Sequence, residues 1–203
     1  MKSVLNGVAA VSVLAILAIS AHAQNSDAPA RQGPPVLAKE LAPARMSARL
    51  QVSSGAFTSG KTLDERFTQN GENMPPPLEW AKGPAGTLSF VVLAEDSGVN
   101  RSDPIVHWVV YNIPGSARNL RSEVPTEGPL SNGALQGKNT MGKMSYMGPK
   151  PPAGQTHPYH FQVFALNTRL DIDPTSADRE AVLNAMKGRV LAVGDIVGNY
   201  TGK

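Results

Sequence analysis

The amino-acid sequence predicts a mainly β fold, an all-β sandwich with a helix at its periphery. Apolar runs of strand length recur along the chain and are separated by glycine- and proline-rich connections. Only one stretch, residues 174–188, combines the apolar spacing of a helix with signals for its start and its stop. Repeated strands with one convincing helix are typical of two packed sheets that carry a peripheral helix.

The strongest predicted strand covers residues 106–113, between Pro104 and Pro114. Both of its faces are mostly apolar, which indicates a central strand covered on two sides. Regular alternation would divide its side chains between the two faces. The two sets are Val106, Trp108 and Val110 on one face, and His107, Val109, Tyr111 and Ile113 on the other.

Further strands are predicted over residues 88–94, 159–166 and from 190 onward, and a half-buried strand over 49–53. Residues 56–77 form a long loop with three consecutive prolines, a length that is usual for functional or closely packed loops. The helix is expected to open at residues 174–176 and to stop at Gly188. Its apolar stripe is Val182, Leu183 and Met186.

The composition limits the classes of function. The 203 residues, 41% of them hydrophobic, suffice for one sizeable domain. The sequence contains no cysteine, which excludes disulfides, thiolate metal sites and a cysteine nucleophile. The formal charge is +3, and no two Lys or Arg residues are adjacent. Scattered basic residues argue against a nucleic-acid-binding stripe.

Residues 1–23 are expected to be a secretory signal peptide. Lys2 provides the positive start, residues 8–19 the apolar core, and Ala21-His22-Ala23 a small-residue cleavage site. The apolar core is shorter than the roughly 20 residues that span a bilayer, so no transmembrane anchor is expected after cleavage. A periplasmic or secreted location follows. Residues 24–45 are rich in alanine and proline and are predicted to be flexible, and the folded domain covers 46–203.

Polar residues gather at the ends of several predicted strands. Glu95 and Asp96 follow the run 88–94, and His107 lies in the strand 106–113. A glycine- and proline-rich loop, residues 148–156, leads to His157 and then into the strand that begins at Tyr159. One histidine in a core strand is more often structural. Two histidines with acids and a rigid loop at strand ends indicate a site.

Several of these stretches resemble the phosphatidylethanolamine-binding proteins, most closely the bacterial Raf-kinase-inhibitor-like branch. The resemblance covers about residues 46–200, with the motifs in the family's order and spacing. It implies a two-sheet antiparallel Greek-key β-sandwich with one or two peripheral helices. The segments that carry it are 67–73, 76–80, 84–87, 95–114, 148–161, 188–192 and 198–200.

The resemblance also implies a ligand pocket. Imidazole and phenol groups donate hydrogen bonds to phosphate oxygens, a nearby carboxylate orients an imidazole, and proline walls reduce the ordering cost of binding. The residues that match the family's pocket are Asp96, His107, Pro151, Pro152, His157 and Tyr159. The chain also departs from the family's pattern. It has Ser97 and Asn100 where prolines are usual, Gly98 where a second acid is usual, Pro158 for arginine and Arg189 for histidine.

Two functions remain open from the sequence. The first is an exported protein that binds a small anionic or phosphate-bearing ligand and acts as an inhibitor or modulator of a protein target. The second is an enzyme in which His107 or His157, with Asp96, carries out acid/base chemistry on a small phosphorylated or acyl substrate. No cofactor is expected. A zinc site of His107, His157 and Asp96 lacks a recognised ligand spacing. The sequence leaves open whether the protein forms a homodimer.

Overall fold

The computed structural model describes residues 33–45, 48–125 and 128–203. The expected signal peptide and residues 24–32 lie outside the described residues. The elements are α1 (Ala38–Leu41), β1 (Val52–Ser53), β2 (Lys61–Thr62), η1 (Glu65–Phe67), β3 (Leu78–Trp80), β4 (Ser89–Asp96), β5 (Ile105–Pro114), β6 (Asn119–Leu120), β7 (Leu135–Gly137), β8 (Thr156–Leu166), η2 (Pro174–Ser176), α2 (Arg179–Met186) and β9 (Val190–Thr201).

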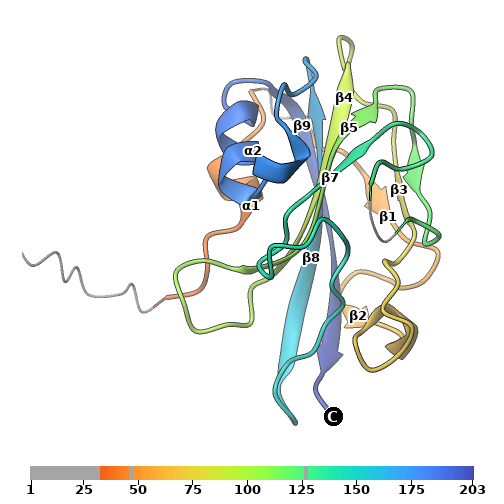
Figure 1. Cartoon of the computed structure of the whole chain (residues 1–203), viewed down its shortest axis with the longest axis vertical. Helices are drawn as coiled ribbons and strands as arrows, with labels where there is room; N and C mark the ends of the chain where they lie inside the picture. Colours follow the sequence, from red (N-terminus) through yellow and green to blue (C-terminus); the bar gives the residue numbers. More distant parts are fainter. Residues whose placement is uncertain (1–32, 46–47, 126–127) are drawn as a thin grey trace, which may run out of the picture.

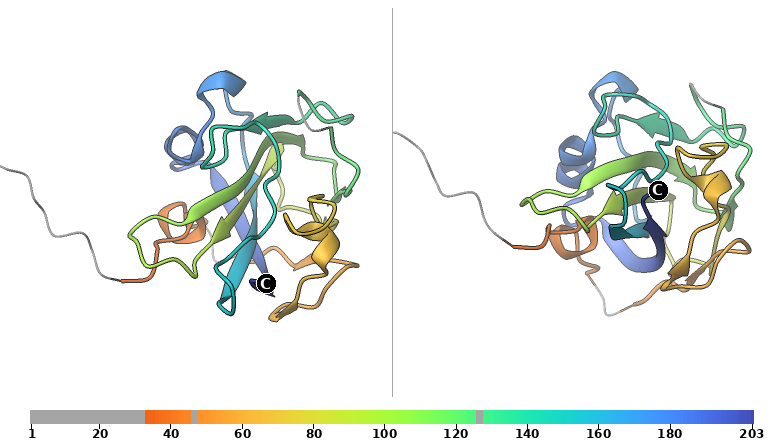
Figure 2. Two further views of the ribbon diagram at one scale, coloured as in Figure 1. Left: turned by 60° about the horizontal axis from the view of Figure 1, so that its bottom comes forward. Right: turned by 90° about the horizontal axis from the view of Figure 1, so that it is seen from below.

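The strands form two sheets. The larger has the order β2-β9-β8-β4-β5-β7, and the smaller has the order β1-β3-β6. Figures 1 and 2 show the small sheet on one face of the large sheet and helices α1 and α2 on the other. The mainly β, two-sheet prediction is confirmed, whereas the Greek-key connectivity stays a prediction. The sheets are not fully antiparallel, because the short edge strand β2 runs parallel to β9.

Each face of the large sheet has its own apolar core. The core between the sheets includes Trp80, Phe90 and Trp108. The core beneath the helices includes Phe164 and Met186. Strand β4 lies between β5 and β8 and is buried along its whole length, because both of its faces are covered. Among the residues described, no helix is long and apolar enough to span a bilayer.

Strand β5 does not alternate regularly. The predicted faces hold for residues 108–111 and are wrong for Val106 and Ile113. Its register with β4 shifts twice, between the partners of Phe90 and Val92 and again between those of Ala94 and Glu95. Each shift is a β-bulge, which inserts an extra residue and exchanges the faces beyond it. Trp108, Val110 and Ile113 consequently face the small sheet. Val106, Val109 and Tyr111 face the helices.

One bulge is built around Asn112. Its φ of 57° lies in the left-handed region, which asparagine tolerates better than most residues. The buried side chain offsets this cost by two hydrogen bonds to the backbone of Leu170: Nδ2 donates to the carbonyl at 2.8 Å, and Oδ1 accepts from the amide at 2.7 Å. The other bulge falls at His107, which lies with Trp108 opposite Ala94.

The helix predicted over 174–188 is divided in two. Residues 174–176 form the separate 3₁₀ turn η2, and α2 begins at Arg179. The start signal lies at Asp178, whose carboxylate accepts a hydrogen bond from the amide of Ala181 at 2.9 Å. The predicted apolar stripe of Val182, Leu183 and Met186 is buried against the sheet.

The structure differs from the flexibility expected for residues 33–45. This segment contains α1 and lies on the helix-side face of the large sheet, where Leu37 and Ala38 are buried. Residues 33–45 contain too few apolar side chains for their sequence to predict this contact. Hydrogen bonds to polar side chains hold the segment against the sheet. The amide of Ala38 donates to Glu95 at 2.8 Å, and the amide of Lys39 donates to Gln162 at 2.8 Å. The N-terminal segment is thus fastened by side chains of β4 and β8.

Glu95 is the centre of this attachment. Its side chain is fully buried, and Oε2 also accepts from Gln162 Nε2 at 2.8 Å. Arg179 at the start of α2 pairs with Oε1 at 2.6 Å and donates a second hydrogen bond to the carbonyl of Val36 at 2.7 Å. Beside it, Asp195 of β9 pairs with both Lys39 and His160. One buried carboxylate therefore joins β4, α2 and the N-terminal segment.

We expect Arg179→Gln to lower the free energy of unfolding by about 3 kcal/mol, because it leaves the buried Glu95 carboxylate without its cation. Arg169→Gln is the control, since Arg169 is exposed, and its effect should stay within about 0.5 kcal/mol. Urea denaturation of both variants measures the difference. Equal midpoints for the two variants would show that Glu95 does not depend on Arg179.

Candidate functional site

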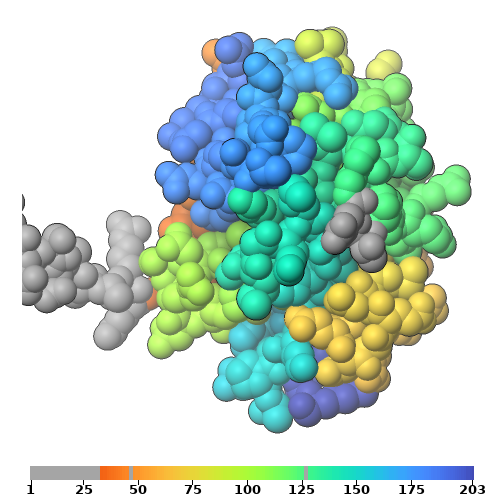
Figure 3. Space-filling model, in the orientation of Figure 1, coloured from red at the N-terminus to blue at the C-terminus, as the bar shows by residue number. Residues whose placement is uncertain are grey.

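The sequence-predicted site residues come together in one pocket. It lies where β4 ends, β5 begins and β8 begins, and its volume is about 410 Å³. Figure 3 shows the segments around 66–74, 97–104 and 140–156 next to one another on the lower half of the molecule. All the predicted residues line the pocket: Asp96, His107, Pro151, Pro152, His157 and Tyr159. Ligand binding by them stays a prediction.

Asp96 and His157 form a buried pair at the end of β4. Both are at least nine-tenths buried, and His157 Nδ1 donates to Asp96 Oδ2 at 2.8 Å. The other carboxylate oxygen accepts from the amide of Gly98 at 2.7 Å, which turns the chain at the strand end. His157 Nε2 lies 3.4 Å from Gln155 Oε1, too far for a strong hydrogen bond. A ligand that offers a closer partner can replace this long contact.

Gly98 explains how the chain accommodates the absence of a second acid. A Cβ atom at this position would lie 2.5 Å from Cγ of the His157 ring. The imidazole occupies the space that a side chain at residue 98 would need. The absence of an acidic side chain at residue 98 is therefore what allows the His157 ring to pack against the backbone of Gly98.

His107 is fixed by the loop that follows β7. Its backbone carbonyl accepts from the amide of Met147 at 2.9 Å, and its Nδ1 lies 2.5 Å from the carbonyl of the same residue. Because a carbonyl only accepts, Nδ1 carries the proton. The ring is buried, and burial lowers the pKa of His107 despite the opposing effects of Met147 and Asp96. The neutral ring with Nδ1–H is the form that the structure favours.

Tyr159 lies between Asp96 and the ring of His107. It lies opposite Asp96 across the β4–β8 ladder, and its ring meets that of His107 edge to face with centroids 5.1 Å apart. Burial, followed by the charge of Asp96, raises the pKa of Tyr159 well above its usual range. The hydroxyl therefore stays protonated and can donate a hydrogen bond.

The proline loop is held in place from two sides. Ala153 bridges to Gly202, and a Cβ at Gly202 would lie 2.3 Å from the carbonyls of Pro151 and Pro152, so only glycine permits this approach. On the other side, Asn73 Oδ1 accepts from the amide of Gly148 at 2.7 Å. The loop is thus positioned before any ligand arrives.

Sequence reasoning missed several residues that shape the site. Met147 acts through its backbone carbonyl, which no residue-type pattern reveals. Gln69 donates to the carbonyl of Gly148 at 2.7 Å and lines the pocket. It belongs to the segment 67–73 that carries the family resemblance, so that signal was present. Lys150 and Asn100 also line the pocket and are exposed at its rim.

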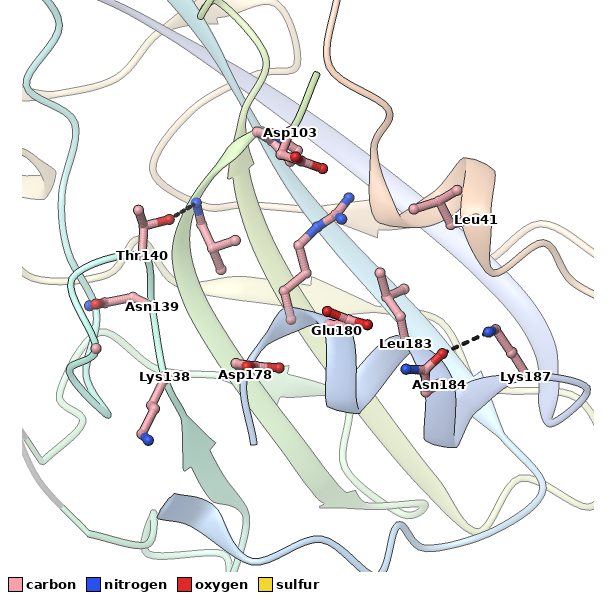
Figure 4. A pocket seen from close by; sticks show the side chains of 14 residues that line it. Leu41, Asp103, Lys138, Asn139, Thr140, Asp178, Glu180, Leu183, Asn184 and Lys187 are labelled. Carbon is pink, nitrogen blue, oxygen red and sulfur yellow. Dashed lines mark hydrogen bonds between the residues drawn. The ribbon is translucent and has the colours of Figure 1, made fainter. Parts of the chain in front are cut away.

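A larger hollow of about 670 Å³ lies beside α2 (Figure 4). Exposed groups of both signs surround it, including Asp103, Glu180 and Lys187. Figure 4 shows Lys187, at the end of α2, hydrogen-bonded to Asn184 of that helix. None of its described lining residues carries a buried polar atom that lacks a partner. The smaller pocket is the candidate site because Asp96, His107, His157 and Tyr159, three of them polar groups in the buried core, converge on it.

The sequence of this chain is similar to a known protein family over most of its length. The sequence model described as phosphatidylethanolamine-binding protein matches residues 53–201. The chain belongs to the phosphatidylethanolamine-binding protein family. A UPF0098 protein of Methanothermobacter thermautotrophicus is 38% identical over 151 residues, which cover 74% of this chain and 98% of that protein. A UPF0098 protein of Aquifex aeolicus is 37% identical over 155 residues, 74% of this chain and 88% of that protein.

Solved structures agree with membership of the phosphatidylethanolamine-binding protein family. YbcL of Escherichia coli, described as a member of the mammalian family, superposes with a TM-score of 0.71 and is 29% identical. The homologue CT736 of Chlamydia trachomatis gives a TM-score of 0.69, also at 29% identity. Each comparison covers 77% of this chain and 100% of the other.

Within residues 33–45, 48–125 and 128–203, no three His, Asp or Glu side chains are grouped as metal ligands.

We expect Gly98→Ala to displace the His157 ring and to destabilise the fold by about 1–3 kcal/mol, since the added methyl overlaps it. Gly55→Ala is the control, because a Cβ there meets nothing within 4 Å. Its effect should lie within about 1 kcal/mol. Thermal unfolding and the NMR shifts of His157 measure both effects. An unmoved His157 resonance in Gly98→Ala would mean that the ring does not pack against residue 98.

Proposed function

We propose that this chain is an exported binding protein whose pocket holds a small anion of the phosphate-headgroup type. The observation that carries the proposal is the convergence of Asp96, His107, His157 and Tyr159 on one pocket of about 410 Å³. Convergent polar groups in a preformed pocket are the usual sign of a small-molecule site. The name of the family, which refers to a phospholipid with a phosphate headgroup, supports the same ligand chemistry.

The distribution of charge supports an anion. Lys150 lies exposed at the rim, and His157, which also lines the pocket, donates from Nδ1 to Asp96. The hydroxyl of Tyr159 adds a neutral donor. Because the proline loop is already fixed, little ordering is needed when a ligand binds. These features suit a binding role.

A second candidate is an enzyme that uses the Asp96–His157 pair for acid/base chemistry. The 2.8 Å contact between them favours this, since a carboxylate that orients an imidazole is a common catalytic arrangement. Among the described residues that line the pocket, none is serine, threonine or cysteine. A hydroxyl nucleophile of the serine or threonine type would have to come from water or the substrate. We therefore favour binding without turnover.

Export rests on residues 1–23, which lie outside the described residues. The charged start, the apolar run and the Ala21-His22-Ala23 site support cleavage after Ala23. We expect the protein recovered from its host to begin at Gln24, which an intact-mass measurement checks. A chain that retains Met1 would contradict export by this route.

His157→Ala should weaken binding of O-phosphoethanolamine by roughly 1.5–3 kcal/mol, because it removes a charge-assisted hydrogen bond. His160→Ala is the matched control, since His160 pairs with Glu95 in the β4–β8 ladder and lies on the opposite face of β8, beside Asp195. NMR titration of the wild type and both variants measures the affinities. Turnover is followed in the same samples by phosphorus NMR, and a signal from released phosphate would favour the enzyme.

Two results would count against the binding proposal. One is the absence of any shift of pocket resonances in the wild-type titration. The other is equal weakening by His157→Ala and His160→Ala, which would place the effect in the fold rather than in the pocket.

A further inference from the structure

Exposed apolar side chains gather at the hollow beside α2. Among the described residues, three large hydrophobic side chains are exposed: Leu41, Leu88 and Met141. Leu41 lines the hollow. Met141 is the most exposed of the three at 69%, and it lies between two residues that line the hollow, Thr140 and Gly142. Apolar side chains that cluster at one place on a surface indicate an interaction site, whereas scattered ones are ordinary.

Hydrogen bonds fix the turn that carries Met141. Asn139 is buried, and its Oδ1 accepts from the amides of Met141 at 2.9 Å and Lys143 at 3.1 Å. The turn is also joined to the start of β5. The amide of Thr140 donates to the carbonyl of Val106 at 3.0 Å, and its Oγ1 accepts from the amide of Val106 at 2.8 Å. Because this backbone is already ordered, burying Met141 against a partner costs only the freedom of its side chain.

The hollow offers a receptor for such a side chain on the same face of the molecule. Its volume is about 670 Å³. Figure 4 shows residues 138–140 on one side of it and α2 on the other. The apolar residues of its lining come from α1, α2 and the chain at the start of β5: Leu41, Pro104, Val106 and Leu183. A protruding methionine and an apolar hollow therefore lie next to each other.

The charges around the hollow indicate which kind of partner fits. Besides Arg179, which pairs with Glu95, five charged side chains line it: Asp103, Lys138, Asp178, Glu180 and Lys187. Within the described residues, none of these five is in an ion pair. A face with both signs of charge can pair with itself, because a two-fold axis places each group opposite a different group of the second copy. Its three carboxylates would instead be repelled by an anionic membrane surface.

We propose that two copies of this chain associate through this face, with Met141 of each copy inserted into the hollow of the other. Each copy contributes one protruding side chain and one hollow, so a two-fold axis satisfies both at once and the assembly closes as a dimer. The inference does not depend on the proposed anion-binding function. The hollow shares no lining residue with the candidate site, which stays open in the dimer.

Analytical ultracentrifugation of the full mature chain over a series of concentrations measures the association. The average mass should rise from that of one copy to that of two. Met141→Lys should raise the dissociation constant at least about tenfold, since it brings a charge into an apolar hollow. Leu88→Lys is the matched control, because Leu88 is also exposed but does not line the hollow, and it should leave the dissociation constant unchanged.

Mixing two variants tests the arrangement itself. Leu41→Glu places an acid in the hollow, so it should weaken the dimer as Met141→Lys does. In an equal mixture of the two, one contact pairs the introduced lysine with the introduced glutamate, and the other contact is that of the wild type. The mixed dimer should therefore be at least about tenfold tighter than the dimer of either variant alone. Because mixing cannot rescue a misfolded chain, this result also verifies the fold of both variants.

The absence of native cysteine allows an independent measurement. Leu41→Cys and Met141→Cys, mixed and treated with oxidised glutathione, should form a disulfide between the two variants, which mass spectrometry of the linked peptides identifies. Leu88→Cys mixed with Met141→Cys should not, because a disulfide requires Cα atoms within about 7 Å of each other.

The outcomes decide for or against this face. A chain that is monomeric at every concentration overturns the proposal, and so does a dimer that Met141→Lys leaves intact. Failure of the mixture to restore association overturns the reciprocal insertion. A monomer that sediments with anionic phospholipid vesicles, and loses this property in Met141→Lys, would overturn the proposal in favour of a membrane. Restoration by mixing, with the disulfide between positions 41 and 141, supports it.

Discussion

Two adjacent carboxylates on strand β4 determine how the molecule is organised. Because side chains alternate along a strand, Glu95 and Asp96 point to opposite faces of the large sheet. β4 is central and fully buried, so each carboxylate needs partners on its own face. Glu95 obtains them from α1, Gln162 and Arg179. Asp96 obtains them from Gly98 and His157 and thereby forms the pocket.

The bulge in β5 supplies the second part of the pocket. Without it, His107 would lie on the face opposite Trp108 and point toward the helices. With it, the imidazole lies beside Trp108 and reaches Tyr159 on the face of the small sheet. Met147 then bonds to His107 twice: its amide donates to the backbone carbonyl of His107, and its carbonyl accepts from Nδ1 of the ring. One local irregularity thus turns a core histidine into a pocket residue, as bulges near functional sites often do.

The sequence predicts long strands well and local irregularities poorly. The runs 88–94, 106–113 and 159–166 correspond to β4, β5 and β8, since long apolar segments leave few alternatives. The bulges were missed because a single polar residue in an apolar strand does not predict one, although His107 and Asn112, where the bulges fall, are the two polar residues of the run. The order of residues 33–45 was missed because it depends on hydrogen bonds to Glu95 and Gln162, which are distant in sequence. Family motifs located the pocket, but the proton on His107 Nδ1 follows only from the carbonyl of Met147.

The N-terminal segment compensates for a weakness in the wall of the pocket. Ser97 and Asn100 stand where the family resemblance predicts prolines, so residues 97–100 lose the stiffness that proline confers. Hydrogen bonds restrain this loop instead. The amide of Ser97 donates to the carbonyl of Pro158 at 3.2 Å, and the carbonyl of Ser102 accepts from the amide of Val36 at 3.3 Å.

This second restraint comes from outside the part of the chain that matches the family model, which begins at residue 53. Val36 is itself held by Arg179, the same residue that pairs with Glu95. Arg179, the partner of Glu95 on the helix side, thus holds Val36, and Val36 in turn holds the loop 97–104. This is the loop that begins at the turn made by Asp96 on the other face. A wall fixed in this way needs less ordering when a ligand binds, which is the advantage that rigid prolines would otherwise provide.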